Sequence, residues 1–250
     1  GRSFRAVQVL LAMCAMGWGA GRLLAADAPV TLTDDGATWT LDNGIVKATI
    51  NKRISNMPSL SYHGVPIVGR SEFWEQVPSG TITSTVTIDP SKNGGERAEV
   101  DVKGSNSGRM DIEVRYTMER GVSGFYTYAM YSHHAGYPAA GEGESRFILQ
   151  MNPTFDWLSV DAQRNKYYPE EPKGEDKYVY TAVQSKNLAY GWSSTKDNVG
   201  MWIVNPTIEY LSGGPTKPEF MCHRDTTPVA APCVLNYWRS SHYGGAAVGV

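Results

Sequence analysis

The chain has 250 residues, of which 41% are hydrophobic, with 23 basic and 25 acidic residues and a formal net charge of −2. This length allows one large domain or two small ones, and the composition excludes a protein with many membrane spans. The balanced charge argues against nucleic acid as a partner, because nucleic acids are bound mainly through surplus basic residues.

The N-terminus has the layout of a signal peptide. Arg2 and Arg5 precede an apolar run, residues 6–21, and Ala25-Ala26 provides small residues for cleavage. Arg22 lies between this run and the small residues, which is unusual for a signal peptide. A transmembrane anchor is less favoured, because the run is shorter than the roughly 18 residues that a span needs.

We therefore expect residues 1–26 to be removed on export, leaving a secreted or periplasmic protein that does not associate with a membrane. The segment contains three arginines and no acidic residue, so its removal would change the net charge to −5. The cysteines that remain, Cys222 and Cys233, lie eleven residues apart. In an oxidising compartment this pair is predicted to form one disulfide.

Alternation of apolar and polar residues predicts strands along most of the remaining chain. Asn43-Gly44 and His63-Gly64 are predicted to be the turns of two hairpins, over residues 38–50 and 59–68. Further strands are predicted at 81–88, 98–102, 110–118, 125–131, 147–151, 178–183, 188–193, 199–204 and 233–238. No helical period appears after the N-terminal segment, so the predicted fold is all-β, a large antiparallel β-sandwich.

Three connections are expected to be long and irregular: residues 131–146, 153–178 and 207–234. Connections in compact domains usually have only a few residues, and long ones on a rigid sheet often carry function. Two basic residues stand out in these connections. Arg146 opens a strand and could bind a planar carboxylate, or could be a surface residue. Lys166, beside Tyr167 and Tyr168, could be desolvated and act as a base, or could be a solvated loop residue.

The stretch from Cys222 to Gly245 is dense in histidine, arginine and aromatic residues. His223 and Arg224 could bind an acidic ligand or form a structural knot with a neighbouring aspartate. Tyr237-Trp238 could stack against sugar rings, or divide between the core and the surface of one strand. His242 follows a strand and precedes two glycines, so it could point into a cleft, although a lone histidine is more often structural.

No metal site or cofactor is predicted. His133-His134 has no carboxylate or cysteine at ligand spacing, and the motifs of phosphate loops, zinc peptidases and EF-hands are absent. A pair of carboxylates for glycoside hydrolysis stays open. The acidic residues in the loops are Glu142, Glu144, Glu170, Glu171, Glu175 and Asp176.

Several segments, taken in order, are similar to the catalytic domain of polysaccharide lyase family 4, the rhamnogalacturonan lyases. They are the Asp-Asn-Gly hairpin, SRFILQMNP, QRNKYYP, LSGGPTKPEFMCHRD and NYWRSSHYGG. The resemblance covers residues 30–250 and implies a super-sandwich of the galactose-mutarotase type. It also implies cleavage of the rhamnose–galacturonate bond of rhamnogalacturonan I by β-elimination, without catalytic calcium. The family usually continues into two further modules, so 27–250 is expected to be a catalytic domain truncated before them.

By position, Lys166 and His242 match the catalytic lysine and histidine of the family, and Arg146 matches the arginine at the uronate carboxylate. Tyr237 matches one cleft tyrosine, whereas Leu235 stands where the fungal pattern has a second, which affects the expected sugar stacking. Arg146 would spread the charge of the carbanion into the carboxyl group. Lys166 would then act as base and His242 as acid, or the reverse.

The resulting hypothesis is a secreted, monomeric lyase whose partner is the acidic polysaccharide rhamnogalacturonan I. One alternative is a non-catalytic pectin-binding or carbohydrate-binding module. The other is a mutarotase-type sugar epimerase, which would be expected to pair a histidine with a glutamate base.

Overall fold

The computed structural model describes residues 26–74, 77–142, 144–159, 162, 165–167, 176–179, 189–204, 219–222, 232–240 and 248–249. In these residues the regular elements are antiparallel strands and one short 3₁₀ turn, η1 (Pro90–Lys92). The all-β antiparallel prediction is confirmed. Within the same residues no helix is long and apolar enough to cross a bilayer. The predicted signal peptide, apart from Ala26, lies outside the described residues.

The first sheet has the strand order β1-β2-β3-β4-β5. Both predicted hairpins are present in it. Gly44, His63 and Gly64 have φ values of 80°, 44° and 81°, the left-handed conformation that tight hairpin turns require. The strands are β1 (Thr31–Asp34), β2 (Thr38–Asp42), β3 (Val46–Asn51), β4 (Ser59–Tyr62) and β5 (Val65–Pro66).

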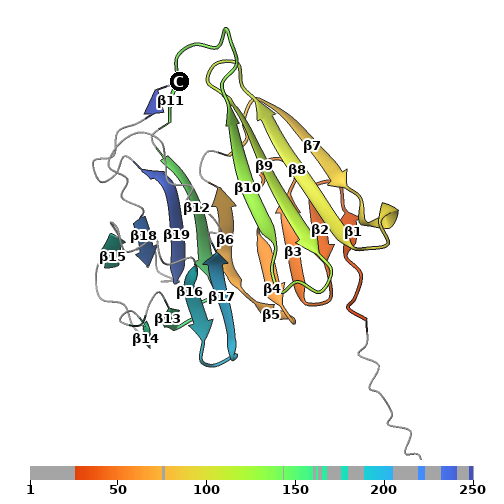
Figure 1. Cartoon of the computed structure of the whole chain (residues 1–250), viewed down its shortest axis with the longest axis vertical. Helices are drawn as coiled ribbons and strands as arrows, with labels where there is room; N and C mark the ends of the chain where they lie inside the picture. Colours follow the sequence, from red (N-terminus) through yellow and green to blue (C-terminus); the bar gives the residue numbers. More distant parts are fainter. Residues whose placement is uncertain are drawn as a thin grey trace, which may run out of the picture.

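The second sheet has the order β10-β9-β8-β7 and lies over the first, so that the two form a sandwich (Figure 1). Its strands are β7 (Thr81–Ile88), β8 (Arg97–Ser105), β9 (Asp111–Glu119) and β10 (Tyr126–Ser132). All four were predicted from their alternation. The apolar positions of β8 and β9 are buried, because they face the first sheet.

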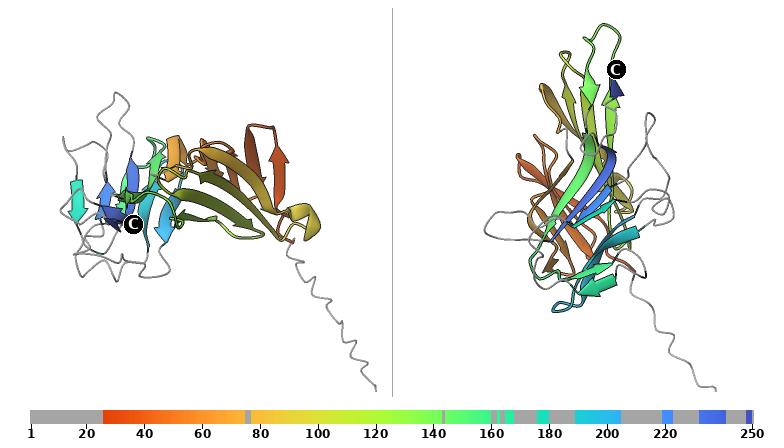
Figure 2. Two further views of the ribbon diagram at one scale, coloured as in Figure 1. Left: turned by 90° about the horizontal axis from the view of Figure 1, so that it is seen from above. Right: turned by 90° about the vertical axis from the view of Figure 1, so that its left-hand side faces the viewer.

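The third sheet has the order β15-β18-β19-β12-β6. Its strands are β6 (Val68–Trp74), β12 (Glu144–Met151), β15 (Asp176–Val179), β18 (Glu219–Cys222) and β19 (Cys233–Ser240). The fourth sheet, β14-β13-β16-β17, contains β13 (Trp157–Ser159), β14 (Asn165–Tyr167), β16 (Ala189–Ser194) and β17 (Val199–Val204). Two short strands, β11 (Gly141–Glu142) and β20 (Val248–Gly249), pair with each other. The third and fourth sheets lie together at the end of the molecule away from β1 and β7 (Figure 2).

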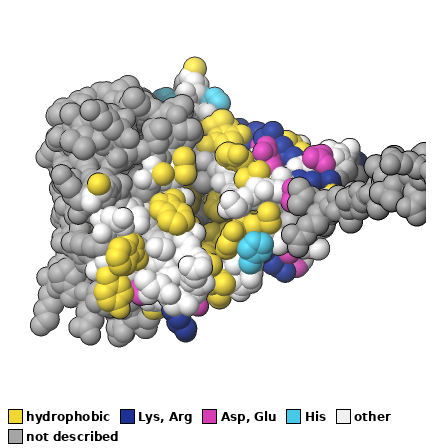
Figure 3. All heavy atoms as spheres, turned by 60° about the horizontal axis from the view of Figure 1, so that its bottom comes forward, with side chains coloured by type: hydrophobic (Ala, Val, Ile, Leu, Met, Phe, Trp, Pro, Cys, Tyr) yellow, Lys and Arg dark blue, Asp and Glu magenta, His cyan; other side chains and the backbone are white. Residues whose placement is uncertain are grey.

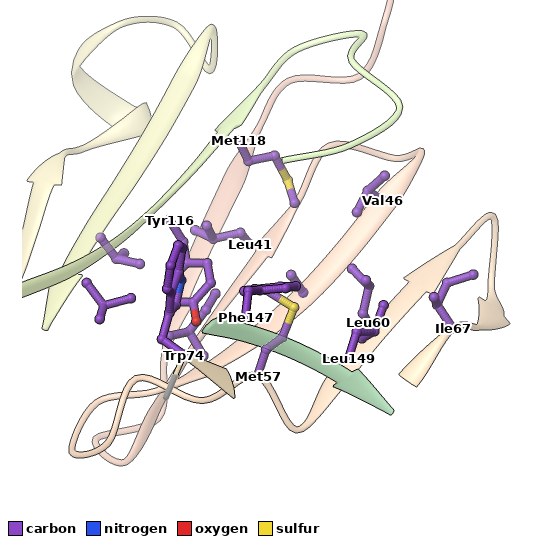
Figure 4. Close-up of a cluster of buried hydrophobic side chains, with 14 of the residues drawn as sticks. Leu41, Val46, Met57, Leu60, Ile67, Trp74, Tyr116, Met118, Phe147 and Leu149 are labelled. Carbon is purple, nitrogen blue, oxygen red and sulfur yellow. The ribbon is translucent and has the colours of Figure 1, made fainter. Parts of the chain in front are cut away.

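One buried cluster connects the sheets. Side chains from β2, β3, β4, β6, β9 and β12 meet in it (Figure 4). Trp74 on β6 packs edge-on against Phe147 on β12, with ring centroids 5.5 Å apart, and its Nε1 donates to Thr127 Oγ1 on β10 at 2.8 Å. The hydroxyl of Tyr116 on β9 donates to Ser55 O at 2.6 Å. These bonds join separate layers within the apolar core.

The three connections predicted to be irregular contain strands. Residues 131–146 include β11 and the start of β12, residues 153–178 include β13 and β14, and residues 207–234 include β18. The expectation of irregular structure was therefore wrong for these parts. The strands that were not predicted, β11, β13, β14 and β18, have only two to four residues each. They are too short for alternation to be visible in the sequence.

Candidate functional site

Arg146 and Tyr237 are register partners in the third sheet. Arg146 lies on β12 and Tyr237 on β19, and the two strands are antiparallel neighbours. The register shifts between Ser145, which pairs with Arg239, and Arg146, so Trp238 is an extra residue on β19. This is the pattern of a β-bulge, which is common beside functional sites and redirects side chains. The structure therefore brings three predicted site residues, Arg146, Tyr237 and Trp238, onto adjacent strands.

The strand that carries Arg146 is held firmly on both sides. Phe147, Ile148 and Leu149 are all buried, so β12 is covered on both of its faces. Ser145 Oγ lies 3.0 Å from the hydroxyl of Tyr131 on β10. At the other end, Met151 N donates to Pro232 O at 2.8 Å, just before β19 begins. The backbone position of residue 146 is consequently fixed by packing and by hydrogen bonds.

Lys166 lies on β14, the edge strand of the fourth sheet. Its register partner is Leu158 on β13, which in turn pairs with Trp192 on β16. Leu158 is 0% exposed and Trp192 is 2% exposed. The interpretation of Lys166 as a residue of an irregular loop was thus wrong, because its backbone belongs to a strand that is anchored on a buried neighbour.

A compact turn connects β12 to β13, and so links the two strands that position Arg146 and Lys166. Asn152 N donates to Ile67 O at 2.8 Å, and Phe155 N donates to Asn152 O at 3.0 Å. Phe155 is 1% exposed. Asp156 accepts from the backbone nitrogen of Thr195 at 2.9 Å. The turn is tied to both the core and the fourth sheet, which limits relative motion of β12 and β13.

The remaining predicted site residues, His242, His223 and Arg224, lie outside the described residues. Cys222 is at the end of β18 and is paired with Val234, the residue after Cys233. The predicted disulfide between the two cysteines stays a prediction. The described residues contain no group of three histidine, cysteine or acidic side chains that could hold a metal ion.

His134, for which no partner was predicted, contacts a buried carboxylate in the structure. His134 Nε2 lies 3.2 Å from Asp111 Oδ2, and the Tyr137 hydroxyl donates to Asp111 Oδ1 at 3.0 Å. Burial raises the pKa of Asp111, but hydrogen bonds from Asn106 N, Tyr137 and His134 outweigh it and hold that pKa below its usual value. The cluster anchors the loop after β10 to the start of β9. Its members are far apart in the sequence, so spacing could not reveal it.

A charged cluster covers the outer face of the second sheet. Arg115 on β9 lies 3.2 Å from Glu99 and 3.8 Å from Asp101, both on β8, and 2.5 Å from Glu113. Burial, followed by repulsion from Glu113, raises the pKa of Asp101 to about 6. Glu99 is also desolvated, but hydrogen bonds from Thr117 and from a second threonine, together with the nearby arginines, hold its pKa below its usual value. The cluster lies in a different sheet from Arg146 and Lys166.

Three exposed or half-buried aromatic residues of the fourth sheet were not predicted as a group: Trp157, Tyr167 and Trp202. Tyr167 is 53% exposed and Trp202 is 46% exposed. Trp157 and Tyr167 are register partners, with ring centroids 6.5 Å apart. Only the position of Tyr167 next to Lys166 gave any signal in the sequence.

Comparison with known proteins gives two matches. The model of the rhamnogalacturonate lyase family matches residues 97–213, which include Arg146, Lys166 and the strands β8 to β17. A curated protein from Dickeya dadantii, a rhamnogalacturonate lyase, is 25% identical to this chain over an alignment of 252 positions, gaps included. The alignment covers 88% of this chain. The chain spans 42% of the length of that relative. The family match and the curated relative agree with the resemblance found in the sequence, and together they support the placement of this chain in the rhamnogalacturonate lyase family.

Proposed function

We propose that the protein is a secreted lyase that cleaves the rhamnose–galacturonate bond of rhamnogalacturonan I by β-elimination. The observation that carries the proposal is the family match over residues 97–213, which contains both Arg146 and Lys166. The structure supports it by holding the backbones of these two residues on strands of neighbouring sheets, connected by the turn at 152–156.

The chemistry requires three groups. A guanidinium at the uronate carboxylate, supplied by Arg146, stabilises the negative charge that develops when the neighbouring carbon loses its proton. Lys166, in its neutral form, takes that proton. The electron pair forms a carbon–carbon double bond, and the bond from the next carbon to the leaving oxygen breaks. His242 donates a proton to this oxygen, which leaves as a rhamnosyl hydroxyl. The other product ends in an unsaturated uronate.

Tyr237 and Trp238 are proposed to contact the sugar beside the carboxylate. Their place opposite Arg146, at the bulge of β19, supports this role because a bulge can direct consecutive residues toward one side of a sheet. His223 and Arg224 are proposed as further contacts to the acidic sugar.

The direct test is to incubate the protein with rhamnogalacturonan I and to follow the ultraviolet absorbance of unsaturated uronates. We expect absorbance to rise with the wild type and to be lost with Lys166→Ala, by about 10²- to 10⁴-fold in kcat, the usual contribution of a general base. Lys196→Ala is the matched control, because Lys196 is an exposed lysine in the turn between β16 and β17. It should retain full activity.

Three results would contradict the proposal. Binding of the polymer without new absorbance would favour a carbohydrate-binding module. A Lys166→Ala variant with wild-type activity would remove the proposed base. Interconversion of sugar anomers or epimers, measured by polarimetry in place of chain cleavage, would favour an epimerase. Export is tested separately, by N-terminal sequencing of protein recovered from the periplasm or the medium, which should begin near Asp27.

A further inference from the structure

The fourth sheet presents one face on which aromatic and small polar residues alternate. The backbone register defines two rows across the strands β14, β13, β16 and β17. The first row is Tyr167, Trp157, Ser193 and Gly200, and the second is Asn165, Ser159, Gly191 and Trp202. Neighbouring strands lie about 4.8 Å apart, so each row is about 14 Å long. We call this surface the aromatic face.

The indole of Trp202 lies against Gly200 on the aromatic face. A Cβ added to Gly200 would collide with the Cη2 and Cζ3 atoms of the Trp202 ring, so the indole occupies the space above this glycine. The side chain nevertheless remains 46% exposed. Nearly half of the Trp202 side chain is therefore accessible to a ligand, although the indole also contacts the glycine backbone.

A hydrogen bond orients the ring of Trp157, which lies beside Tyr167. Trp157 Nε1 donates to Asn165 Oδ1 at 2.5 Å, and Ser159 Oγ donates to the same oxygen at 3.4 Å. Trp157 and Tyr167 are tilted by 39° to each other. Fixed rings cost less conformational entropy on binding than mobile ones. The orientation of Trp157 is thus set before any ligand arrives.

The composition of the aromatic face selects among possible ligands. Its eight residues include no charged side chain, and the glycines and serines between the rings keep it shallow. The face of an aromatic ring is electron-rich and attracts C–H groups, while serine and asparagine side chains bind hydroxyl groups. A sugar ring has both features, C–H groups on its faces and hydroxyls at its edge. The absence of charge in the two rows favours neutral sugars over uronates.

We propose that the aromatic face binds neutral sugar residues of the polysaccharide, as a surface additional to the groups that act on the uronate. This inference rests on the proposed function, and it adds where the uncharged sugars of the polysaccharide are bound. The surface is separate from the proposed base, because position 166, one residue before Tyr167 on β14, belongs to the opposite face of the sheet, in register with Leu158 and Trp192. Figure 3 views the molecule with the bottom of Figure 1 turned forward and shows hydrophobic side chains interspersed with white surface, which is backbone and other side chains.

The test compares Trp202→Ala with Tyr126→Ala. Tyr126, on β10 of the second sheet, is an aromatic residue of similar exposure, 55%, and is the matched control. Affinity for rhamnogalacturonan I is measured by calorimetry in a Lys166→Ala background, so that the polymer stays intact. We expect Trp202→Ala to weaken binding roughly 3- to 10-fold, the loss typical of one aromatic contact, and Tyr126→Ala to leave it unchanged. With Lys166 present, Trp202→Ala should raise KM by a similar factor and leave kcat unchanged.

A second variant guards against misfolding of the first. Gly200→Ala retains the indole but displaces it, so it should weaken binding in the same direction while the near-ultraviolet circular dichroism still reports a folded protein. Affinity and KM that stay at wild-type values in Trp202→Ala and Gly200→Ala overturn the inference and leave the lyase proposal intact. Binding that depends on Trp202 in a protein without lyase activity overturns the lyase proposal and retains the aromatic face. A dimer that Trp202→Ala dissociates, with polymer binding unchanged, would make the face a protein interface and also overturn the inference.

Discussion

Arg146 on β12 lies opposite Tyr237 on β19, and the register of the two strands changes at this pair. A guanidinium binds a carboxylate through two parallel hydrogen bonds, which a lysine ammonium cannot reproduce. We therefore expect Arg146→Lys to reduce kcat/KM on rhamnogalacturonan I by about 10- to 100-fold, although the charge is kept, since hydrogen bonds to charged groups contribute about 1.5–3 kcal/mol.

Arg109→Lys is a suitable control for this change, because Arg109 is exposed in the turn between β8 and β9. Activity is measured by the initial rate of ultraviolet absorbance. Equal rates for wild type and Arg146→Lys would mean that position 146 does not bind the carboxylate in a bidentate manner.

Asn43 is a buried residue in the turn of the first hairpin, and its side chain makes four hydrogen bonds to the backbone. It is 0% exposed; its Nδ2 donates to Glu119 O and Val122 O, each at 2.8 Å, and its Oδ1 accepts from the backbone nitrogens of Ile45 and Val46. Asn43→Ala leaves these groups without partners, so we expect the free energy of unfolding to fall by about 2–4 kcal/mol. Denaturant titration measures the loss.

Asn43→Asp is the comparison for that variant. It keeps the acceptor for the two backbone nitrogens but removes the donors to the two carbonyls. At neutral pH a loss at least as large as that of Asn43→Ala is expected, because a buried carboxylate oxygen would face two carbonyl oxygens. A loss as small as that of an exposed substitution would show that the two carbonyl contacts contribute little.

Asp101 should make stability depend on pH. Burial raises its pKa from the ordinary aspartate value of 3.8 to about 6 in the folded protein, so the folded state binds the proton more tightly. Stability from this group is complete below about pH 4 and is lost as the pH rises through about 6. Asp101→Asn removes the cost of the buried charge.

The expected result is that Asp101→Asn is more stable than the wild type at pH 7–8, by at most about 3 kcal/mol, with the difference vanishing near pH 4. Denaturant titration of both proteins across this range measures it. A difference that instead grows on acidification would reverse the assigned sign and would indicate that the ion pair with Arg115 outweighs burial.

Gly191 allows β16 and β17 to approach closely. A Cβ at this position would collide with Met201 O and approach Trp202 Cα, both in the backbone of β17. Gly191→Ala should therefore destabilise the protein by about 1–3 kcal/mol, as overpacking usually does. Gly124→Ala is the control, because no heavy atom lies within 4 Å of its added Cβ. Equal melting temperatures for the two variants would contradict the close approach.

Local patterns predicted the long strands and the two tight hairpins, because alternation and turn-forming pairs such as Asn43-Gly44 act within a few residues. They did not predict the strand of Lys166, whose three residues are too few for alternation to be visible. The opposition of Arg146 and Tyr237 was also beyond local patterns, since register between strands distant in sequence is set by packing of the whole sheet. The resemblance named these residues but not their arrangement.

The extra residue at Trp238 has a consequence for length. On the two sides of the bulge, β19 keeps its pairing with β12, although β19 uses one more residue to cover the same distance. Deletion of Trp238 would therefore leave a continuous ladder in which Arg239 still pairs with Ser145. A change of one residue in the length of β19 is thus absorbed at the bulge, and the register of the strand on both sides of it is retained.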